Sequence, residues 1–97
     1  MTEVIRTAKP WGHELLLGEW QGWKIKILHI KKGCRLSKQY HKEKTEYLFN
    51  LNDETLKFIQ PFKIHRPEAK DETVDILEIS KGSDEDIVRL ENDYRRE

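Results

Sequence analysis

The fold is constrained most by a strict alternation of apolar and charged residues in the stretch 23–31. Successive side chains of an extended chain point to opposite faces, so this alternation is typical of a β-strand. Three apolar side chains share one face and two lysines share the other, namely Trp23, Ile25 and Ile27 against Lys24 and Lys26. Leu28 and Ile30 then extend the apolar character to the second face. We therefore expect the far end of this strand to be covered on both sides.

Further apolar runs of strand length flank this stretch, and turn-forming residues separate them. The runs are Val4–Ile5, His13–Leu17, Tyr47–Leu51, Leu56–Ile59 and Val74–Ile79. Gly18 is expected to end the second run, and Gly22 supplies the freedom in φ for a tight reversal between residues 20 and 23. The polar stretch 52–55 predicts a second hairpin. The pattern predicts an all-β fold, a small antiparallel sandwich or barrel.

The C-terminal stretch leaves two structures open. Ser83 followed by Asp86 resembles a helix start, and Ile87, Leu90 and Tyr94 lie at helical spacing. The four residues 87–90 fit an extended strand equally well. A short C-terminal helix is therefore one of two expectations.

Length, charge and cysteine content limit the class of protein. The 97 residues predict one domain over 1–97, near the lower size limit for an adequate core without disulfides or metal. A net charge of zero argues against non-specific binding to nucleic acid or an anionic membrane. The single cysteine, Cys34, cannot form an internal disulfide, and the sequence shows neither a signal-peptide pattern nor a membrane-spanning apolar run. We expect a folded, cytoplasmic protein.

A row of polar side chains follows the turn at Gly33. Ser37, Gln39 and His41 would share one face of a strand, which indicates a polar cavity on that side. Glu46 lies at odd spacing from His41, so it can reach the same cavity only if residues 42–45 bend the chain.

A second histidine, His65, follows the turn at Pro61. Together with His41 and Glu46 it forms a set of nitrogen and oxygen donors that suits zinc, iron, manganese or nickel. Gln39 could add a neutral oxygen. The alternative is that all of these are ordinary polar residues on the surfaces of strands.

Charge is distributed unevenly along the chain. Residues 24–44 are mostly basic and residues 68–97 mostly acidic. The two regions could be solvated faces that pair within the fold, or the basic region could attract a phosphorylated ligand to the neighbouring site. Arg66 leaves the same choice between binding a phosphate and forming a surface ion pair.

Four segments, taken in order, resemble the cupins, and among them the cupin domains of mannose-6-phosphate isomerases, including the C-terminal domain of bifunctional mannose-1-phosphate guanylyltransferase/isomerases. The segments are Lys9–Gly12, the stretch from Lys26 through Gly33 to Glu46, Ile59–Arg66, and Asp86–Tyr94. The resemblance implies a double-stranded β-helix, which is a jelly-roll-like barrel.

The resemblance also implies a site. Its metal, usually zinc, would be held by Gln39, His41, Glu46 and His65, with Ser37 and Arg66 near the substrate. A divalent ion polarises the carbonyl and hydroxyl oxygens of a sugar phosphate, which eases proton transfer between adjacent carbons in an aldose–ketose conversion. No residue identifies itself as the general base.

The sequence departs from the family in its middle. The stretch Tyr47–Gln60 is shorter than its counterpart in a typical cupin, and Phe62 stands where the family usually has glycine. A shortened wall would leave an open sheet edge, which a second subunit could cover, so a homodimer is expected. Three functions remain open: a metal-dependent sugar-phosphate isomerase, a noncatalytic or accessory cupin that binds a sugar, nucleotide-sugar or other small anion, and a structural dimer with a hydrated polar row.

Overall fold

The computed structural model describes residues 3–94, which form eight strands and no helix. Six strands make one antiparallel sheet in the order β1-β2-β3-β7-β5-β6, and the other two make a small second sheet. The large sheet contains β1 (Ile5–Lys9), β2 (Gly12–Trp20), β3 (Trp23–Ile30), β7 (Val74–Lys81), β5 (Thr45–Asn50) and β6 (Thr55–Ile59). The small sheet pairs β4 (Lys38–Tyr40) with β8 (Val88–Glu91).

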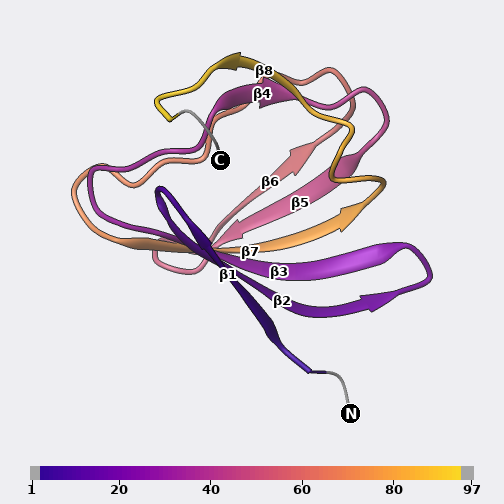
Figure 1. Ribbon diagram of the computed structural model, residues 1–97, viewed down its shortest axis with the longest axis horizontal. Coiled ribbons are helices and arrows are strands. Elements are labelled where there is room, and N and C mark those ends of the chain that lie inside the picture. The colour runs from indigo at the N-terminus through magenta and orange to yellow at the C-terminus, as the bar shows by residue number, and fades with distance from the viewer. Residues whose placement is uncertain (1–2, 95–97) are drawn as a thin grey trace.

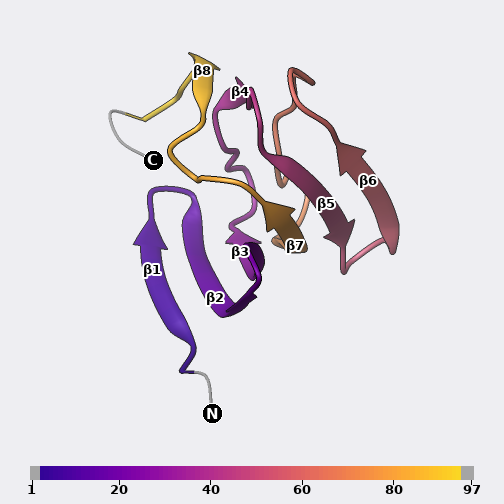
Figure 2. The same ribbon diagram turned by 90° about the vertical axis from the view of Figure 1, so that its right-hand side faces the viewer.

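The two sheets form separate layers, with β4 and β8 lying above the large sheet in Figure 1. Figure 2, turned by 90°, shows β1, β2 and β3 on one side of the molecule and β5 and β6 on the other. The all-β, antiparallel prediction is confirmed. No helix within residues 3–94 has the length and apolar character needed to cross a bilayer.

Two predicted hairpins are present. Trp20 pairs with Trp23 across a two-residue turn in which Gln21 and Gly22 have φ values of 49° and 84°. Positive φ at both central residues is the backbone that matches the twist of a hairpin. The second hairpin joins β5 to β6 through residues 51–54.

The C-terminal stretch takes the extended one of its two predicted structures. The possible C-terminal helix is absent, because residues 83–86 make one turn and the chain then becomes extended in β8. One expectation about a strand end is wrong. Gly18 does not end its strand, since β2 continues to Trp20. The register shifts between Leu16 and Gly18, so Gly18 lies at an irregularity that the strand passes through.

The core lies between the layers and changes character along the strands. On the inner face of β7, Val74 and Ile76 are followed by Glu78 and Ser80, and all four are buried. The apolar end holds the buried residues Trp11, Leu28, Ile30, Leu36, Leu48, Ile59, Ala69, Val74 and Ile76. The other end is polar, and it contains the candidate site.

The outer face of the large sheet carries two apolar cross-strand rows. The strand register aligns Ile25, Ile79, Tyr47 and Phe58 in one row and Ile27, Leu77, Phe49 and Leu56 in the next. We call these the outer apolar rows. Their members are half-buried or exposed, and Phe58 is 45% exposed.

Candidate metal centre

The three residues of the candidate centre come from separate elements. His41 directly follows β4, and Glu46 lies in β5. His65 lies in an irregular segment that a backbone pair joins to β4, because the N–H groups of Gln39 and His65 each donate to the other residue's carbonyl at 3.0 and 2.9 Å. The small sheet therefore positions both histidines.

The bend between His41 and Glu46 is held by Asp86. Its carboxylate accepts the backbone N–H groups of residues 42–44 at 3.1, 2.6 and 3.0 Å. These bonds turn the chain so that Glu46 Oε1 lies 2.7 Å from His41 Nε2. The predicted bend is confirmed, although its anchor comes from the far end of the chain.

The donor atoms of His41, Glu46 and His65 converge. One ligand atom from each lies within 4.8 Å of the others, and His65 Nε2 is 3.9 Å from Glu46 Oε2. The rings are oriented by main-chain carbonyls, since His41 Nδ1 is 2.6 Å from the oxygen of Asp86 and His65 Nδ1 is 3.1 Å from that of Lys63. A carbonyl can only accept, so each Nδ1 carries the proton and each Nε2 keeps a lone pair in the neutral ring.

Both Nε2 atoms are buried and complete no hydrogen bond, even though the Glu46 carboxylate is so close. Buried polar atoms in proteins normally have partners, so two such nitrogens facing one carboxylate need an explanation. Metal–ligand bonds of about 2.1 Å place neighbouring ligand atoms about 3.0 to 3.4 Å apart. The separations of 2.7 and 3.9 Å lie on either side of that range, so small side-chain shifts would admit an ion.

The electrostatics favour the ionisation states that metal ligands need at Glu46 and His65, but they favour the protonated ring at His41. Burial raises the pKa of Glu46, but contacts with His41 and Lys44 outweigh burial and lower it. Burial lowers the pKa of His65, which keeps that ring neutral. Burial also lowers the pKa of His41, but the Glu46 carboxylate and the Asp86 carbonyl outweigh it and raise the value.

Two of the other predicted site residues, Gln39 and Ser37, lie beside the centre. Gln39 is buried on the wall of the cavity that His41 and Glu46 share, and its Oε1 accepts a hydrogen bond from Ser37 Oγ at 3.0 Å. Ser37 is fully buried behind it.

Arg66 lies against a second cavity of about 300 Å³. Its guanidinium donates to the Leu36 carbonyl at 2.9 Å and pairs with Glu91 and Asp93 at 3.1 and 3.4 Å. Arg66 therefore makes the ion pairs that the sequence left open, away from the cavity of His41 and Glu46.

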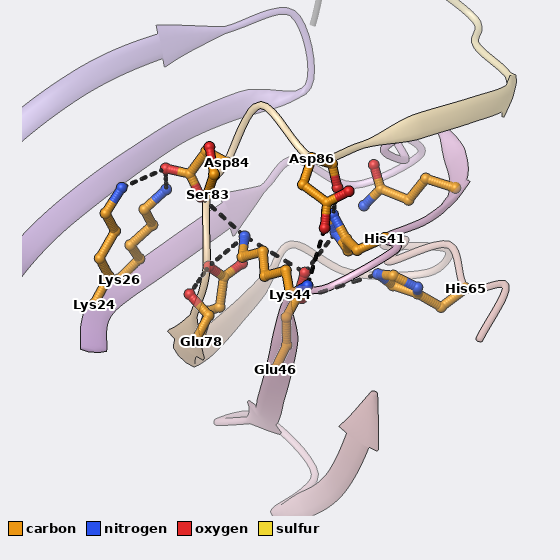
Figure 3. A network of polar contacts seen from close by, with 12 residues as sticks. Lys24, Lys26, His41, Lys44, Glu46, His65, Glu78, Ser83, Asp84 and Asp86 are labelled. Atoms are coloured by element: carbon orange, nitrogen blue, oxygen red, sulfur yellow. Dashed lines mark hydrogen bonds and ion pairs between the residues drawn. The ribbon is translucent and has the colours of Figure 1, made fainter. Parts of the chain in front are cut away.

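A charged network adjoins the centre inside a cavity of about 180 Å³, and Figure 3 shows it beside His41 and His65. Lys44 Nζ is 3.5 Å from Glu46 Oε1, 3.6 Å from Glu78 Oε2 and 2.9 Å from Asp84 Oδ1. Lys26 Nζ in turn lies 3.0 Å from Asp84 Oδ2 and 3.3 Å from Glu14 Oε1. Lys44 and Glu78 keep only 5% and 8% of their side chains exposed.

Sequence reasoning missed this network. One signal was present, because Glu78 continues the alternation of Val74 and Ile76 onto the buried face. Lys44 lies in the bend, where no periodicity predicts its direction.

No protein-family model matches the chain, and no curated protein matches it either. The functional assignment therefore rests on the residues themselves.

Proposed function

We propose that the chain is a small cupin-type barrel that binds a divalent metal ion and interconverts aldose and ketose sugar phosphates. His41, Glu46 and His65 would hold the ion, with the amide oxygen of Gln39 as a fourth ligand. The observation that supports this most is the pair of buried Nε2 atoms, without hydrogen bonds, facing the Glu46 carboxylate. Two histidines and one carboxylate leave positions open for a substrate, as catalytic metal sites require.

The chain's own residues supply the remaining functions. A bound divalent ion would polarise the substrate's carbonyl and hydroxyl oxygens. Glu78 lines the same cavity, and Ser80 Oγ donates to its Oε2 at 3.0 Å. Burial and the nearby Glu46 raise the pKa of Glu78, which brings it nearer the working range of a proton carrier at neutral pH. We assign to its carboxylate the proton that moves between adjacent substrate carbons.

Metal content tests the centre directly. Wild-type protein dialysed against zinc should retain one equivalent, whereas His41→Ala and His65→Ala should retain far less. His13→Ala is the matched control, because His13 stacks on His29 on the outer face, at 4.5 Å between ring centroids, away from the centre. Equal zinc content in the wild type and His41→Ala would remove the metal centre from the proposal.

Turnover tests the reaction. Purified protein should interconvert mannose 6-phosphate and fructose 6-phosphate with zinc and not after chelation. Glu78→Gln should keep the metal but lose turnover, because an amide cannot accept the proton. No turnover in the zinc-loaded wild type would refute the isomerase assignment.

The second candidate is a noncatalytic cupin that binds a sugar or small anion. The cavity of about 180 Å³ is smaller than the roughly 300 Å³ at the low end for ligand pockets, so by itself it suits a small anion better than a whole sugar phosphate. The engagement of Arg66 with Glu91 and Asp93 points the same way. Stabilisation of the protein by mannose 6-phosphate in thermal unfolding, without turnover, would select this function.

A further inference from the structure

We propose that Lys24, Lys26 and Lys44 form a binding site for a phosphate group, and that the Asp84 carboxylate fills this site when no ligand is present. The inference rests on the proposed function, because it names the residues that would hold the phosphate of the sugar phosphate. It replaces Arg66, which lies elsewhere, as the anion-binding group.

Three ammonium groups converge on one carboxylate. Lys24 Nζ and Lys26 Nζ both lie 3.0 Å from Asp84 Oδ2, and Lys44 Nζ lies 2.9 Å from Oδ1. Figure 3 shows the three lysines around Asp84. The side chains of Lys26 and Lys44 are only 8% and 5% exposed, whereas that of Asp84 is 40% exposed. Lys26 and Lys44 are thus held inside, Lys24 lies nearer the surface at 24% exposed, and the Asp84 carboxylate reaches them from the solvent side.

Asp84 lies in the loop of residues 82–86, which is fixed at both of its ends. At one end Gly82 has a φ of 122° and approaches Lys44 so closely that an added Cβ would lie 2.9 Å from the Lys44 Cα. At the other end Asp86 binds the backbone N–H groups of residues 42–44. Only residues 83–85 lie between these anchors. Asp84 can therefore leave the lysines by rotating its side chain, with the backbone in place.

A phosphate suits the three cations better than the carboxylate does. Lys24 and Lys26 share a single oxygen of Asp84, while a phosphate monoester carries three terminal oxygens and a charge of about −1.5 to −2 at pH 7. Each ammonium could then have an oxygen of its own, and charge-assisted bonds of this kind are the strong ones. Glu14 lies 3.3 Å from Lys26 and Glu78 lies 3.6 Å from Lys44, so both lysines stay oriented when Asp84 turns away.

The proposed phosphate site adjoins the candidate metal centre. Lys26, Lys44 and Asp84 line the same cavity as His41 and Glu46. Lys44 Nζ is also 3.5 Å from Glu46 Oε1. A small phosphorylated molecule bound to the lysines would therefore present its remaining oxygen atoms to the metal ligands.

Calorimetric titration with inorganic phosphate at pH 7, on protein treated with a chelator, tests this site without the metal. Asp84→Asn removes the internal competitor, so its dissociation constant for phosphate should fall about tenfold below that of the wild type, the effect of losing one competing charge-assisted contact. Asp71→Asn is the matched control, since Asp71 is an exposed aspartate in a loop outside the cavity. Adding Lys24→Gln to Asp84→Asn should abolish the gain.

Amide chemical shifts in the wild type provide a second measurement that needs no variant to fold. Phosphate should shift the signals of residues 82–86 and leave those of the 50–55 hairpin unchanged. Binding in Asp84→Asn no tighter than in Asp71→Asn, or shifts absent from residues 82–86, would overturn the proposal. The proposed metal centre is measured separately by zinc content without phosphate, so either site can fail while the other stands.

Discussion

Replacing Lys44 by methionine should strongly destabilise the fold, because its ammonium is the cation that two buried carboxylates share. Lys44 Nζ is 3.5 Å from Glu46 and 3.6 Å from Glu78, whose side chains are 4% and 8% exposed. Methionine keeps most of the apolar stem and removes the charge. Asp84 retains Lys24 and Lys26, so the cost falls on the two glutamates.

Breaking a buried ion pair on one side costs about 3 to 5 kcal/mol, because the remaining charge is left without compensation. A domain of this length is expected to have about 5 to 15 kcal/mol of stability in total, so the variant loses a large share of it. The corresponding fall in the midpoint of thermal unfolding is about 12 to 40 °C.

The loss should also depend on pH. Burial already raises the pKa of Glu78, and removing Lys44 raises it further. A carboxyl whose folded pKa lies above the unfolded value destabilises the fold at high pH and stops doing so once it is protonated. Lys44→Met should therefore be less destabilising at pH 5 than at pH 8.

Urea unfolding at both pH values measures these effects. Lys57→Met is the matched control, because Lys57 is exposed on β6 and makes no ion pair within residues 3–94. Adding Glu78→Gln to Lys44→Met should recover part of the loss. If Lys44→Met costs less than about 1 kcal/mol, as expected of an exposed ion pair, the network is not the buried ion-pair system described above.

Three further predictions test other parts of the molecule. The lysines lower the pKa of Asp84 below its ordinary 3.8 despite the opposing effect of burial, so its contribution to stability is present above pH 3.8 and disappears as the pH falls below that value. Between pH 5 and pH 3 the free energy of unfolding in urea should therefore fall less for Asp84→Asn than for the wild type. Phe62 has a φ of 68°, which favours glycine, so Phe62→Gly should raise the free energy of unfolding by about 0.5 to 1 kcal/mol, and a loss of stability would contradict this. The chain should form a homodimer through the outer apolar rows, so light scattering should give twice the 11.7 kDa chain mass. A Tyr47→Lys/Phe58→Lys variant should be monomeric, and a monomeric wild type would contradict the assignment.

Much of the fold follows from local patterns. The alternation in β3 and the glycine at residue 22 predict a strand and its hairpin, and the structure has both. The same kind of local pattern left helix and strand open after residue 83. There the acceptor chemistry that starts a helix is present, but the Asp86 carboxylate binds the backbone of residues 42–44 instead. A partner more than forty residues away is not visible in a single sequence, so the choice between helix and strand could not be made from the local signal.

The candidate site, like the fold, could be predicted from local patterns only in part. His41 and Glu46 could be paired from strand periodicity and a single bend, and the structure places them in contact. Lys44 could not, because a residue inside a bend has no face that periodicity assigns. Arg66 shows the reverse error, because it was predicted to lie near the substrate. Its neighbour in sequence, His65, lies at the centre, but the Arg66 side chain turns to Glu91 and Asp93.

The polar interior has a consequence for the rest of the molecule. Charged residues take up one end of the space between the sheets, so the apolar core is confined to the other end and is small for 97 residues. Eight further apolar side chains lie on the outer face of the large sheet, in the outer apolar rows. The outer apolar rows lie on four strands of five to eight residues. At about 4.8 Å between strands and about 3.3 Å per residue, these strands give a face of roughly 430 Å². A stable complex buries about 800 Å² on each partner. A second copy, with its own outer apolar rows, matches the chemistry of this face, and sheets stack in this way in β-sandwiches. The rows would then form the apolar centre of a larger interface. The expected homodimer is thus better explained by this face than by an open sheet edge, because burying the face would supply the apolar contact that the polar cavity takes from the core.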